Sequence, residues 1–272
     1  MRFSKVTAAY FSPTGNTRLA ARTLAKELAD GLGLSWGEVD ITLPSGRGKT
    51  YSFAADELVV FASPTYAGRL PNKMQPAFAS DFHGEGTAAV PVVLFGNRSF
   101  QDALSELGIL LRQNGFVPVG GASLVSEHVF SDKLATGRPD ADDLSALKEF
   151  AHRLLEKLTA AQEPEPVALP GNDPVGPYYT PLGTDGQPAK FLKAVPKTSD
   201  ACTNCGACAA VCPMGSIVAD DCREMQGICI KCQACIKACP AEAKYFDDPA
   251  FLSHVAMLEQ NYTSHQENGF YL

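Results

Sequence analysis

The cysteines are the feature that most constrains what this chain can fold into. All nine lie between Cys202 and Cys239, and no cysteine precedes them. A disulfide-stabilised secreted domain spreads its cysteines along its loops, and an odd number cannot all pair within one chain. Such crowding predicts a site for metal or cluster ligation in a reducing compartment. We therefore expect a cytoplasmic protein.

Eight of the nine cysteines form two copies of one pattern. In each copy, three cysteines follow one another with two residues between them, and a fourth comes three residues later and is followed by proline; the second copy begins 27 residues after the first. This spacing is typical of ligands to [4Fe-4S] clusters. Structural zinc is the alternative, but zinc commonly takes its ligands as two pairs with a longer spacer. Cys222 belongs to neither copy, and we interpret it as a bystander.

The two copies resemble the bacterial two-[4Fe-4S] ferredoxin family over residues 200–245. In that family the fourth cysteine of each copy binds the cluster of the other copy. The resemblance therefore implies a first cluster held by Cys202, Cys205, Cys208 and Cys239. It implies a second cluster held by Cys229, Cys232, Cys235 and Cys212.

The chain before residue 160 alternates between two hydrophobic patterns. Short apolar runs typical of buried strands occupy Lys5–Phe11, Leu34–Asp40, Glu57–Ser63, Ala88–Phe95 and Phe116–Ser123. Between them, helical periodicity predicts one helix over Thr17–Asp30 with a stop at Gly31, another over Phe100–Asn114, and a last one that opens at Pro139-Asp140. Five strands separated by helices favour a parallel sheet that is covered on both faces.

Polar loops follow the first, third and fourth of these strands. The loop Ser12–Thr17 combines hydroxyls and a glycine with the N–H groups of a helix N-terminus, which suits a phosphate monoester. An ordinary capped turn would contain the same residue types. The loops Ser63–Gly68 and Gly96–Asp102 each carry an aromatic side chain, Tyr66 and Phe100. Because the three loops should meet at one edge of the sheet, they could flank a flat ring that bears a phosphorylated tail.

Residues 4–158 with these loops resemble the flavodoxin family. The resemblance implies a flavodoxin-like doubly wound five-stranded parallel α/β sheet of order 2-1-3-4-5 that binds FMN. The residues it assigns to FMN are Ser12, Thr14, Gly15, Asn16 and Thr17 at the phosphate, and Ser63, Pro64, Thr65, Tyr66, Ala67, Gly68, Gly96, Asn97, Arg98, Phe100 and Asp102 at the ring. The whole chain resembles the fused flavodoxin–ferredoxin proteins of bacteria and archaea.

Four segments follow from these assignments. Residues 1–162 form the flavodoxin-like FMN domain, and residues 163–197 form a linker or strap that is rich in proline. Residues 198–248 form a small α+β two-cluster ferredoxin domain, and residues 249–272 form a tail with a short helix near Phe251–Gln260. Tyr178 and Tyr179 are large for a solvated linker, so the strap could pack on a domain.

Composition and charge exclude several function classes. The formal net charge is −7, which disfavours a general nucleic-acid binder. We expect no membrane span, because no apolar run approaches the roughly 18–20 residues that a bilayer requires. We expect no signal peptide, because the first residues lack an apolar core of about 7–15 residues followed by a small-residue cleavage site. The segment Gly46–Thr50 resembles the end of a nucleotide-binding P-loop, but Leu43 stands where the motif needs glycine.

FMN and two clusters in one chain would convert between one-electron and two-electron steps. We expect an intracellular electron-transfer protein that connects an external low-potential donor, the clusters, FMN and an unknown acceptor. The alternatives are an FMN-dependent reductase of a quinone, nitro compound or enone, and a redox sensor. We assign no catalytic residue, and a homodimer is a candidate assembly. His128 could approach the flavin, but we favour a structural role in its loop.

Overall fold

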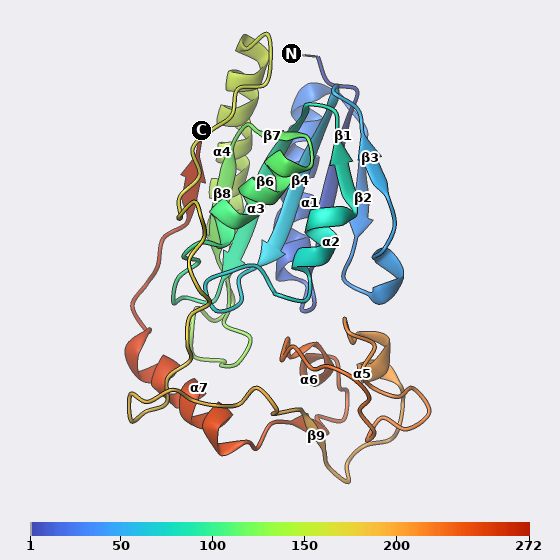
Figure 1. Ribbon diagram of the computed structural model, residues 1–272, viewed down its shortest axis with the longest axis vertical. Coiled ribbons are helices and arrows are strands. Elements are labelled where there is room, and N and C mark those ends of the chain that lie inside the picture. The colour runs from blue at the N-terminus through green and yellow to red at the C-terminus, as the bar shows by residue number, and fades with distance from the viewer. Residues whose placement is uncertain (1) are drawn as a thin grey trace.

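The computed structural model describes residues 2–272 (Figure 1). Its first part contains β1 (Lys5–Tyr10), α1 (Asn16–Leu32), β2 (Trp36–Asp40), the 3-10 turn η1 (Pro44–Gly46), β3 (Tyr51–Phe53), β4 (Glu57–Pro64), α2 (Gln75–Ser80), β5 (Phe82–Gly84), β6 (Thr87–Phe95), α3 (Ala103–Gln113), β7 (Phe116–Pro118), β8 (Gly121–Val125) and α4 (Ala141–Ala160). Its second part contains β9 (Lys197–Thr198), α5 (Ala207–Ala210), α6 (Ala234–Lys237), β10 (Lys244–Tyr245), α7 (Pro249–Asn261) and β11 (Gly269–Tyr271).

The main sheet has the strand order β11-β8-β6-β4-β1-β2, with β7 also paired to β6. The strands β2, β1, β4, β6 and β8 run parallel to their neighbours. In terms of the five strands expected from the sequence, this is the order 2-1-3-4-5. The predicted doubly wound parallel sheet is therefore confirmed, and the loops that follow β1, β4, β6 and β8 meet at one edge.

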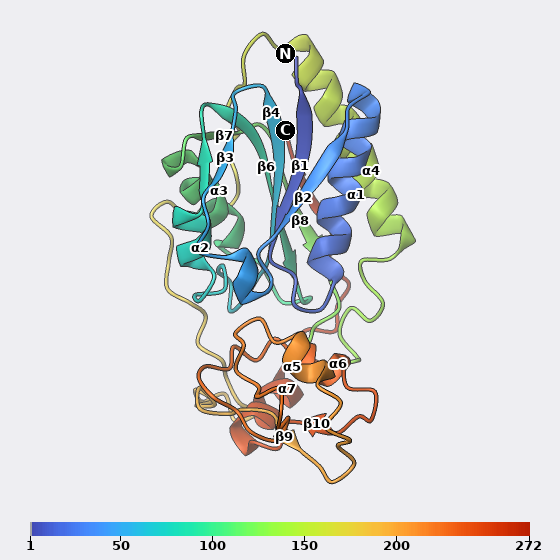
Figure 2. The same ribbon diagram turned by 90° about the vertical axis from the view of Figure 1, so that its right-hand side faces the viewer.

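Helices cover both faces of the sheet (Figure 2). On one face, α1 and α4 pack over small and branched side chains of the strands, such as Ala8 and Val60. On the other face, α2 and α3 cover an aromatic-rich core, in which the rings of Phe61 and Phe82 meet edge to face at 5.2 Å. A sheet with helices on both faces needs strands that are apolar on both sides, and these strands are.

Local sequence signals predicted the start of α4 correctly and the end of α1 incorrectly. Asp140 caps α4 as expected, because its side chain accepts hydrogen bonds from the N–H groups of Asp142 and Asp143. The predicted stop at Gly31 is wrong, since α1 continues to Leu32 and ends at Gly33, whose φ is 67°. A Cβ on Gly31 would lie 2.4 Å from a methyl group of Leu155. Gly31 therefore permits close packing of α1 on α4.

The fifth predicted strand is broken into two pieces. Val119 and Gly120 separate β7 from β8, and both strands pair with β6. A strand that the sequence pattern does not indicate, β11, pairs antiparallel with β8 and places Gly269 opposite Ser123. The tail of the chain thus covers what would otherwise be an open edge of the sheet.

The cysteine-rich module lies directly beneath the edge where the polar loops meet (Figure 1). It holds α5, α6 and the two-stranded pair of β9 and β10. The chain enters the module through the strap and leaves it through the tail, which begins with α7. Both connections run alongside the flavodoxin-like domain, so the module is attached to that domain at both of its ends.

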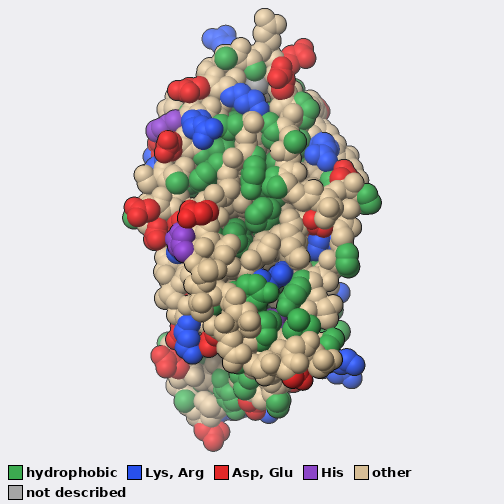
Figure 3. Space-filling view, turned by 90° about the vertical axis from the view of Figure 1, so that its left-hand side faces the viewer, with side chains coloured by type: hydrophobic (Ala, Val, Ile, Leu, Met, Phe, Trp, Pro, Cys, Tyr) green, Lys and Arg blue, Asp and Glu red, His purple; other side chains and the backbone are tan. Residues whose placement is uncertain are grey.

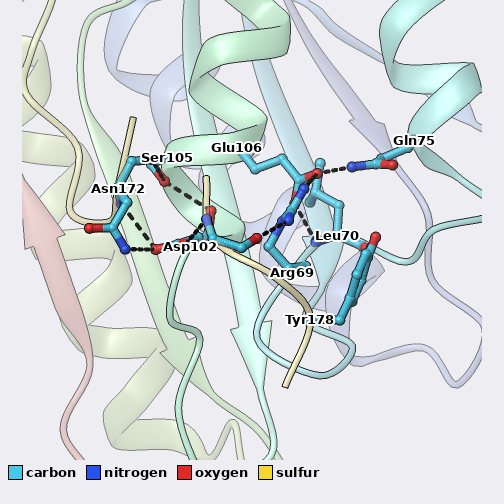
Figure 4. A network of polar contacts seen from close by, with 9 residues as sticks. Arg69, Leu70, Gln75, Asp102, Ser105, Glu106, Asn172 and Tyr178 are labelled. Atoms are coloured by element: carbon cyan, nitrogen blue, oxygen red, sulfur yellow. Dashed lines mark hydrogen bonds and ion pairs between the residues drawn. The ribbon is translucent and has the colours of Figure 1, made fainter. Parts of the chain in front are cut away.

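Buried charges anchor the strap (Figure 4). Asp102 accepts hydrogen bonds from the N–H groups of Asn172 and Gly176 and from the Asn172 side chain, at 2.7–3.0 Å. Arg69 makes two 2.7 Å hydrogen bonds to Glu106 and also donates to the carbonyl of Gly176. The expectation that the strap packs on a domain, drawn from its two tyrosines, is confirmed.

A second buried ion pair anchors the tail. Arg138 binds Asp143 with both prongs of its guanidinium and donates to the carbonyl of Gln266 at 2.7 Å. Asp143 in turn accepts from the side chain of Asn268 at 2.7 Å, and the side-chain amide oxygen of Asn268 accepts from the N–H of Val125. These bonds place β11 at the end of the sheet.

Candidate functional site: a cavity between the loops and the cysteine-rich module

A cavity of about 240 Å³ lies between the polar loops and the cysteine-rich module. The flavodoxin-like loops contribute Thr14, Asn16, Thr17, Pro64, Thr65, Tyr66, Ala67, Gly96 and Arg98, together with Ser126–Phe130 after β8. The strap, the module and α7 contribute Tyr179, Pro181, Phe191, Ile230, Lys231, His254 and Leu258. Nine of the sixteen residues assigned to FMN from the sequence therefore line one cavity.

The loop after β1 offers unused hydrogen-bond donors at one end of this cavity. The N–H groups of Thr14, Gly15, Asn16 and Thr17 have no acceptor among residues 2–272, and neither threonine hydroxyl has a partner there. Gly15 has a φ of 99°, which favours glycine at this turn. Four N–H groups that converge at a helix N-terminus suit a phosphate.

Two residues assigned to the phosphate have structural partners instead. The Ser12 hydroxyl accepts from the N–H of Arg18 at 2.9 Å, and Ser12 lies in a neighbouring groove. The Asn16 amide lines the cavity but donates to Ser126 and to the carbonyl of Arg138. These bonds shape the loop, and they occupy the donors of the Asn16 amide.

The loop after β4 contributes an unpartnered hydroxyl and an aromatic ring. The hydroxyl of Thr65 is buried and has no hydrogen-bond partner among the described residues. Tyr66 also lines the cavity, and burial raises its pKa well above the ordinary value, with a further rise from nearby Cys232 and Cys229. Tyr66 therefore lies between the cavity and the thiols of the second cysteine copy.

Five other residues assigned to the ring have partners within the protein. Asn97 donates to the carbonyls of Tyr262 and Ser264, Phe100 packs on Phe95 with a ring separation of 5.4 Å, and Asp102 binds the strap. Ser63 is buried and bonds to the carbonyl of the next residue, and Gly68 packs against Gln101. These five residues support the loops and do not line the cavity.

The aromatic wall comes from elements that the sequence analysis did not connect with the site. Tyr179 of the strap stacks under the guanidinium of Arg98, whose carbon is 3.9 Å from the ring centroid. Phe191 stacks on His254 of α7 at 5.4 Å. The sequence offered one signal for this wall, the large aromatic side chains of the strap. It offered no signal for Phe191 and His254, because only tertiary packing brings them to the cavity.

Two histidines line the same cavity, and their Nδ1 atoms have different hydrogen-bond partners, an N–H group for His128 and a carbonyl oxygen for His254. His128 Nδ1 accepts from the N–H of Phe130 at 3.2 Å, and burial lowers its pKa to about 4. His254 Nδ1 lies 2.8 Å from the carbonyl oxygen of Leu182, and burial lowers its pKa as well. Both rings are therefore neutral at pH 7. The expected loop role of His128 holds, and the residue also lines the cavity.

The eight patterned cysteines line two smaller cavities in the module. One is lined by Cys202, Cys205, Cys208 and Cys239, and we call it the distal cavity. The other is lined by Cys212, Cys229, Cys232 and Cys235, and we call it the proximal cavity. These are the two crossed sets that the resemblance implies. Backbone N–H groups point at several of the sulfurs, as in Ala243 to Cys239 at 3.2 Å and Ser216 to Cys212 at 3.3 Å.

Cys222 is a fifth cysteine on the distal cavity. It is buried, its N–H donates to the Asn204 side chain at 2.7 Å, and its carbonyl accepts from the buried amine of Lys244. These bonds fix the backbone of the loop around the cavity. They fit the interpretation of Cys222 as a packing residue.

The proximal cavity and the 240 Å³ cavity are neighbours. Ile230 and Lys231 line both of them. On the other side of the phosphate-like loop, a groove of about 380 Å³ is lined by Arg18 and by Lys237 of α6. The loop Ser12–Thr17 itself contains no lysine or arginine. The fold places Arg18 of α1 and Lys237 of α6 beside it.

Family models match both cysteine-rich segments. Residues 195–218 and residues 226–245 each match a model described as a 4Fe-4S binding domain. Together with the strand order of the first part, this decides the architecture. The chain therefore joins a flavodoxin-like α/β fold to two segments that match 4Fe-4S binding domains. These matches support a redox role in electron transfer.

Solved structures that are similar to the first part include flavodoxins. A flavodoxin of Streptococcus pneumonia TIGR4 is 22% identical, with 57% of this chain and 99% of that chain covered and a TM-score of 0.40. Flavodoxin 2 of Bacillus cereus is 18% identical, with 57% and 99% covered and a TM-score of 0.42. The rubredoxin oxygen:oxidoreductase of Desulfovibrio gigas is 16% identical, with 58% and 37% covered and a TM-score of 0.36. No curated protein sequence matches the chain.

Two further surface features bear on partners. Within residues 2–272, none of the helices has the length and apolar character needed to cross a membrane. On the face shown in Figure 3, Lys and Arg side chains are scattered among acidic ones and do not gather into one basic patch.

Proposed function

We propose that this fused flavodoxin–ferredoxin carries electrons between two [4Fe-4S] clusters and FMN. In this proposal FMN occupies the 240 Å³ cavity, with its phosphate at the loop of Thr14 and Thr17. The four unused N–H groups of that loop and the unpartnered hydroxyl of Thr65 support it, because each lacks a partner that a phosphate or a ring polar atom would supply. FMN would supply the step between one-electron and two-electron transfer.

The two clusters would occupy the distal and proximal cavities. Four thiols of the repeated pattern line each cavity, and backbone N–H groups are directed at the sulfurs, as is typical of cluster ligands. The crossed ligand sets would hold the clusters close to each other. We therefore assign Cys202, Cys205, Cys208 and Cys239 to the distal cluster and the other four to the proximal cluster.

One observation supports the proposed order of electron transfer: the proximal cavity and the cavity proposed for FMN share lining residues. Ile230 and Lys231 lie between the proximal cavity and the cavity proposed for FMN, and Tyr66 lies near Cys232 and Cys229. Cys205 on the distal cavity is exposed, whereas Cys232 on the proximal cavity is buried. An external donor would therefore deliver electrons at the distal cluster, and they would reach FMN through the proximal one.

The residues that line the proposed FMN cavity on the side of the module also favour an electron carrier over a reductase of small molecules. Ile230, Lys231 and α7 line the cavity opposite the flavodoxin-like loops, so they would narrow the access of a substrate to a bound flavin. The physiological acceptor would then receive electrons through the clusters or after the module moves. Quinones, nitro compounds and enones remain test substrates for the alternative.

Flash photolysis tests this route. Reduced methyl viologen would inject less than one electron per chain under anaerobic conditions, and cluster and flavin absorbance would be followed together. We expect flavin reduction in a phase whose rate does not depend on protein concentration, since it is intramolecular. Cys205→Ser should retain this phase, because methyl viologen is small enough to reduce the proximal cluster directly. Cys232→Ser should lose it, because the proximal cluster is the one that passes electrons to FMN.

The matched control is Cys222→Ala, which changes a buried cysteine outside both ligand sets. It should keep both clusters and the intramolecular phase. Loss of the phase in Cys205→Ser together with its retention in Cys232→Ser would reverse the proposed order of the clusters. A phase that depends on protein concentration in the unmodified chain would refute internal transfer.

A further inference from the structure

The two histidines of the large cavity have complementary free nitrogens. His128 uses Nδ1 as an acceptor, so its neutral ring carries the proton on Nε2. His254 lies with Nδ1 against a carbonyl oxygen, which can only accept, so its neutral ring leaves a lone pair on Nε2. Neither Nε2 has a partner among the described residues, and neither is among the buried unpartnered atoms. Both nitrogens are therefore open to the cavity.

Packing holds both rings in place. The His128 ring meets Phe130 edge to face at 5.1 Å and lies so close to Gly96 that a Cβ there would be 2.5 Å from its Cδ2 atom. His254 is stacked on Phe191 with an interplanar angle of 28°. Fixed rings lose little freedom when a ligand binds, so their free nitrogens act as a preorganised pair.

The other charged groups of this wall are already engaged. Arg98 lies over Tyr179 and donates to Gln101 at 3.0 Å. Glu127 accepts from Lys237, and Lys231 donates to the carbonyl of Leu192 at 2.8 Å. On this side of the cavity the two histidines thus add one neutral donor and one neutral acceptor to the site.

A flavin presents the matching groups. The pyrimidine edge of its ring carries one N–H, at N3, between two carbonyl oxygens, which gives a donor next to acceptors. We infer that His254 Nε2 accepts the hydrogen bond of the flavin N3–H and that His128 Nε2–H donates to an adjacent flavin carbonyl. The inference rests on the proposed binding of FMN, and it assigns flavin recognition to α7 and to the loop after β8.

The pair makes the flavin site depend on a segment outside the flavodoxin-like domain. His254 belongs to α7, which follows the cysteine-rich module in the chain. A bound flavin would therefore bond to the part of the chain that positions the module. Flavin binding and docking of the module would support each other.

A methylated cofactor tests the contact without relying on turnover. The full chain with its clusters intact would be freed of flavin and titrated with FMN and with 3-methyl-FMN, in which a methyl group replaces the N3 proton. We expect the unmodified chain to bind 3-methyl-FMN about tenfold more weakly than FMN, because His254 Nε2 loses its donor and meets a methyl group.

Two substitutions of His254 separate its two nitrogens. In His254→Asn the amide can keep the bond to Leu182 but cannot reach the Nε2 position, so FMN affinity should fall about tenfold and the preference for FMN should shrink to less than about twofold. In His254→Gln the amide oxygen can take the place of Nε2, so part of the preference should return. His128→Phe should weaken both flavins equally, since the N3 contact remains.

His83→Phe is the matched control, because His83 is exposed on β5 and does not line the cavity. Its affinities should equal those of the unmodified chain. Equal binding of FMN and 3-methyl-FMN by the unmodified chain, or an unchanged preference in His254→Asn, would overturn the inference while leaving the proposed function intact. Failure of the unmodified chain to bind either flavin would overturn the proposed function itself.

Discussion

Lys237 of the cysteine-rich module donates a 2.5 Å hydrogen bond to Glu127, in the loop that follows β8. Burial alone would raise the pKa of Glu127, but the bond from Lys237 and a second from the N–H of Gly137 hold it below its ordinary value. Arg47 of the flavodoxin-like domain also donates to the carbonyl of Pro213 in the module. These polar contacts join the two domains next to the candidate flavin cavity.

Removing the Lys237 amine should loosen this contact only modestly. A partly exposed ion pair contributes about 1 kcal/mol or less, and the strap and tail would still hold the module. We expect Lys237→Met to slow intramolecular electron transfer by less than about fivefold at low salt and to remove part of its salt dependence. Lys26→Met removes an exposed pair within α1 and should change neither. A total loss of transfer in Lys237→Met would mean that this single pair holds the domains together.

Asp102 should matter for the strap and not for the cofactor. Asp102→Ala removes three hydrogen bonds to a carboxylate and leaves two N–H groups of the strap unpartnered, which should destabilise strap docking by about 2 kcal/mol. Limited proteolysis should then cut the strap faster. Asp173→Ala, which removes an exposed carboxylate 3.7 Å from Arg112, is the control and should behave like the unmodified chain. Normal protease resistance in Asp102→Ala would contradict the anchoring role.

The threonines of the first loop should bind flavin phosphate. Thr14→Val combined with Thr17→Val keeps the side-chain shape but removes both hydroxyls, so FMN affinity should fall by about tenfold or more. Cluster absorbance should stay unchanged, because the module is separate from this loop. Riboflavin, which lacks the phosphate, should bind the variant and the unmodified chain equally. A larger effect on riboflavin than on FMN would show that the loop serves another purpose.

Cys212 tests the crossed ligand sets. It belongs to the first cysteine copy but lines the proximal cavity with Cys229, Cys232 and Cys235. Cys212→Ala should therefore impair the cluster of the second copy, which paramagnetic resonance and iron analysis of the reduced protein can separate from the other. Cys222→Ala should leave both clusters intact. Loss restricted to the cluster of Cys202, Cys205 and Cys208 would refute the crossing.

His128 should make the fold sensitive to acid. Its pKa is about 4 in the folded chain because the ring is buried, compared with about 6.5 in the unfolded chain. The unfolded state therefore binds more protons between these values, and stability that is complete above about pH 6.5 is lost as the pH falls toward 4. Between pH 7 and pH 5 the difference is about 2 kcal/mol.

Unfolding in urea, followed by the fluorescence of the single tryptophan, Trp36, measures this loss in the flavodoxin-like domain. His128→Gln should be less sensitive to pH by roughly that amount, whereas the exposed His152→Gln should match the unmodified chain. An identical pH dependence in His128→Gln would mean that the ring is accessible to protons in the folded state.

Local sequence patterns predicted the features that depend mainly on residues close together in the sequence. The cysteine spacing indicated which three thiols of each copy share a site, and the resemblance to two-cluster ferredoxins implied the crossed fourth ligand. Apolar periodicity gave the five parallel strands. The stop at Gly31 failed because a glycine can serve either a helix end or a close helix contact, and the sequence pattern is the same for both.

The rest of the site depends on tertiary contacts between distant segments. Phe100 and Asp102 lie on a loop of the correct edge, yet one faces the core and the other faces the strap. His254 and Tyr179 reach the cavity only because α7 and the strap fold back over it. Strand β11 is three residues long, too short for a periodic signal, and pairing with β8 defines it.

Cofactor analysis of the protein purified without oxygen tests the central claim most directly. The account predicts one FMN, about eight iron atoms and about eight sulfides per chain, corresponding to two [4Fe-4S] clusters beside one flavin. A colourless protein, or one that carries zinc in place of iron and sulfide, would contradict it.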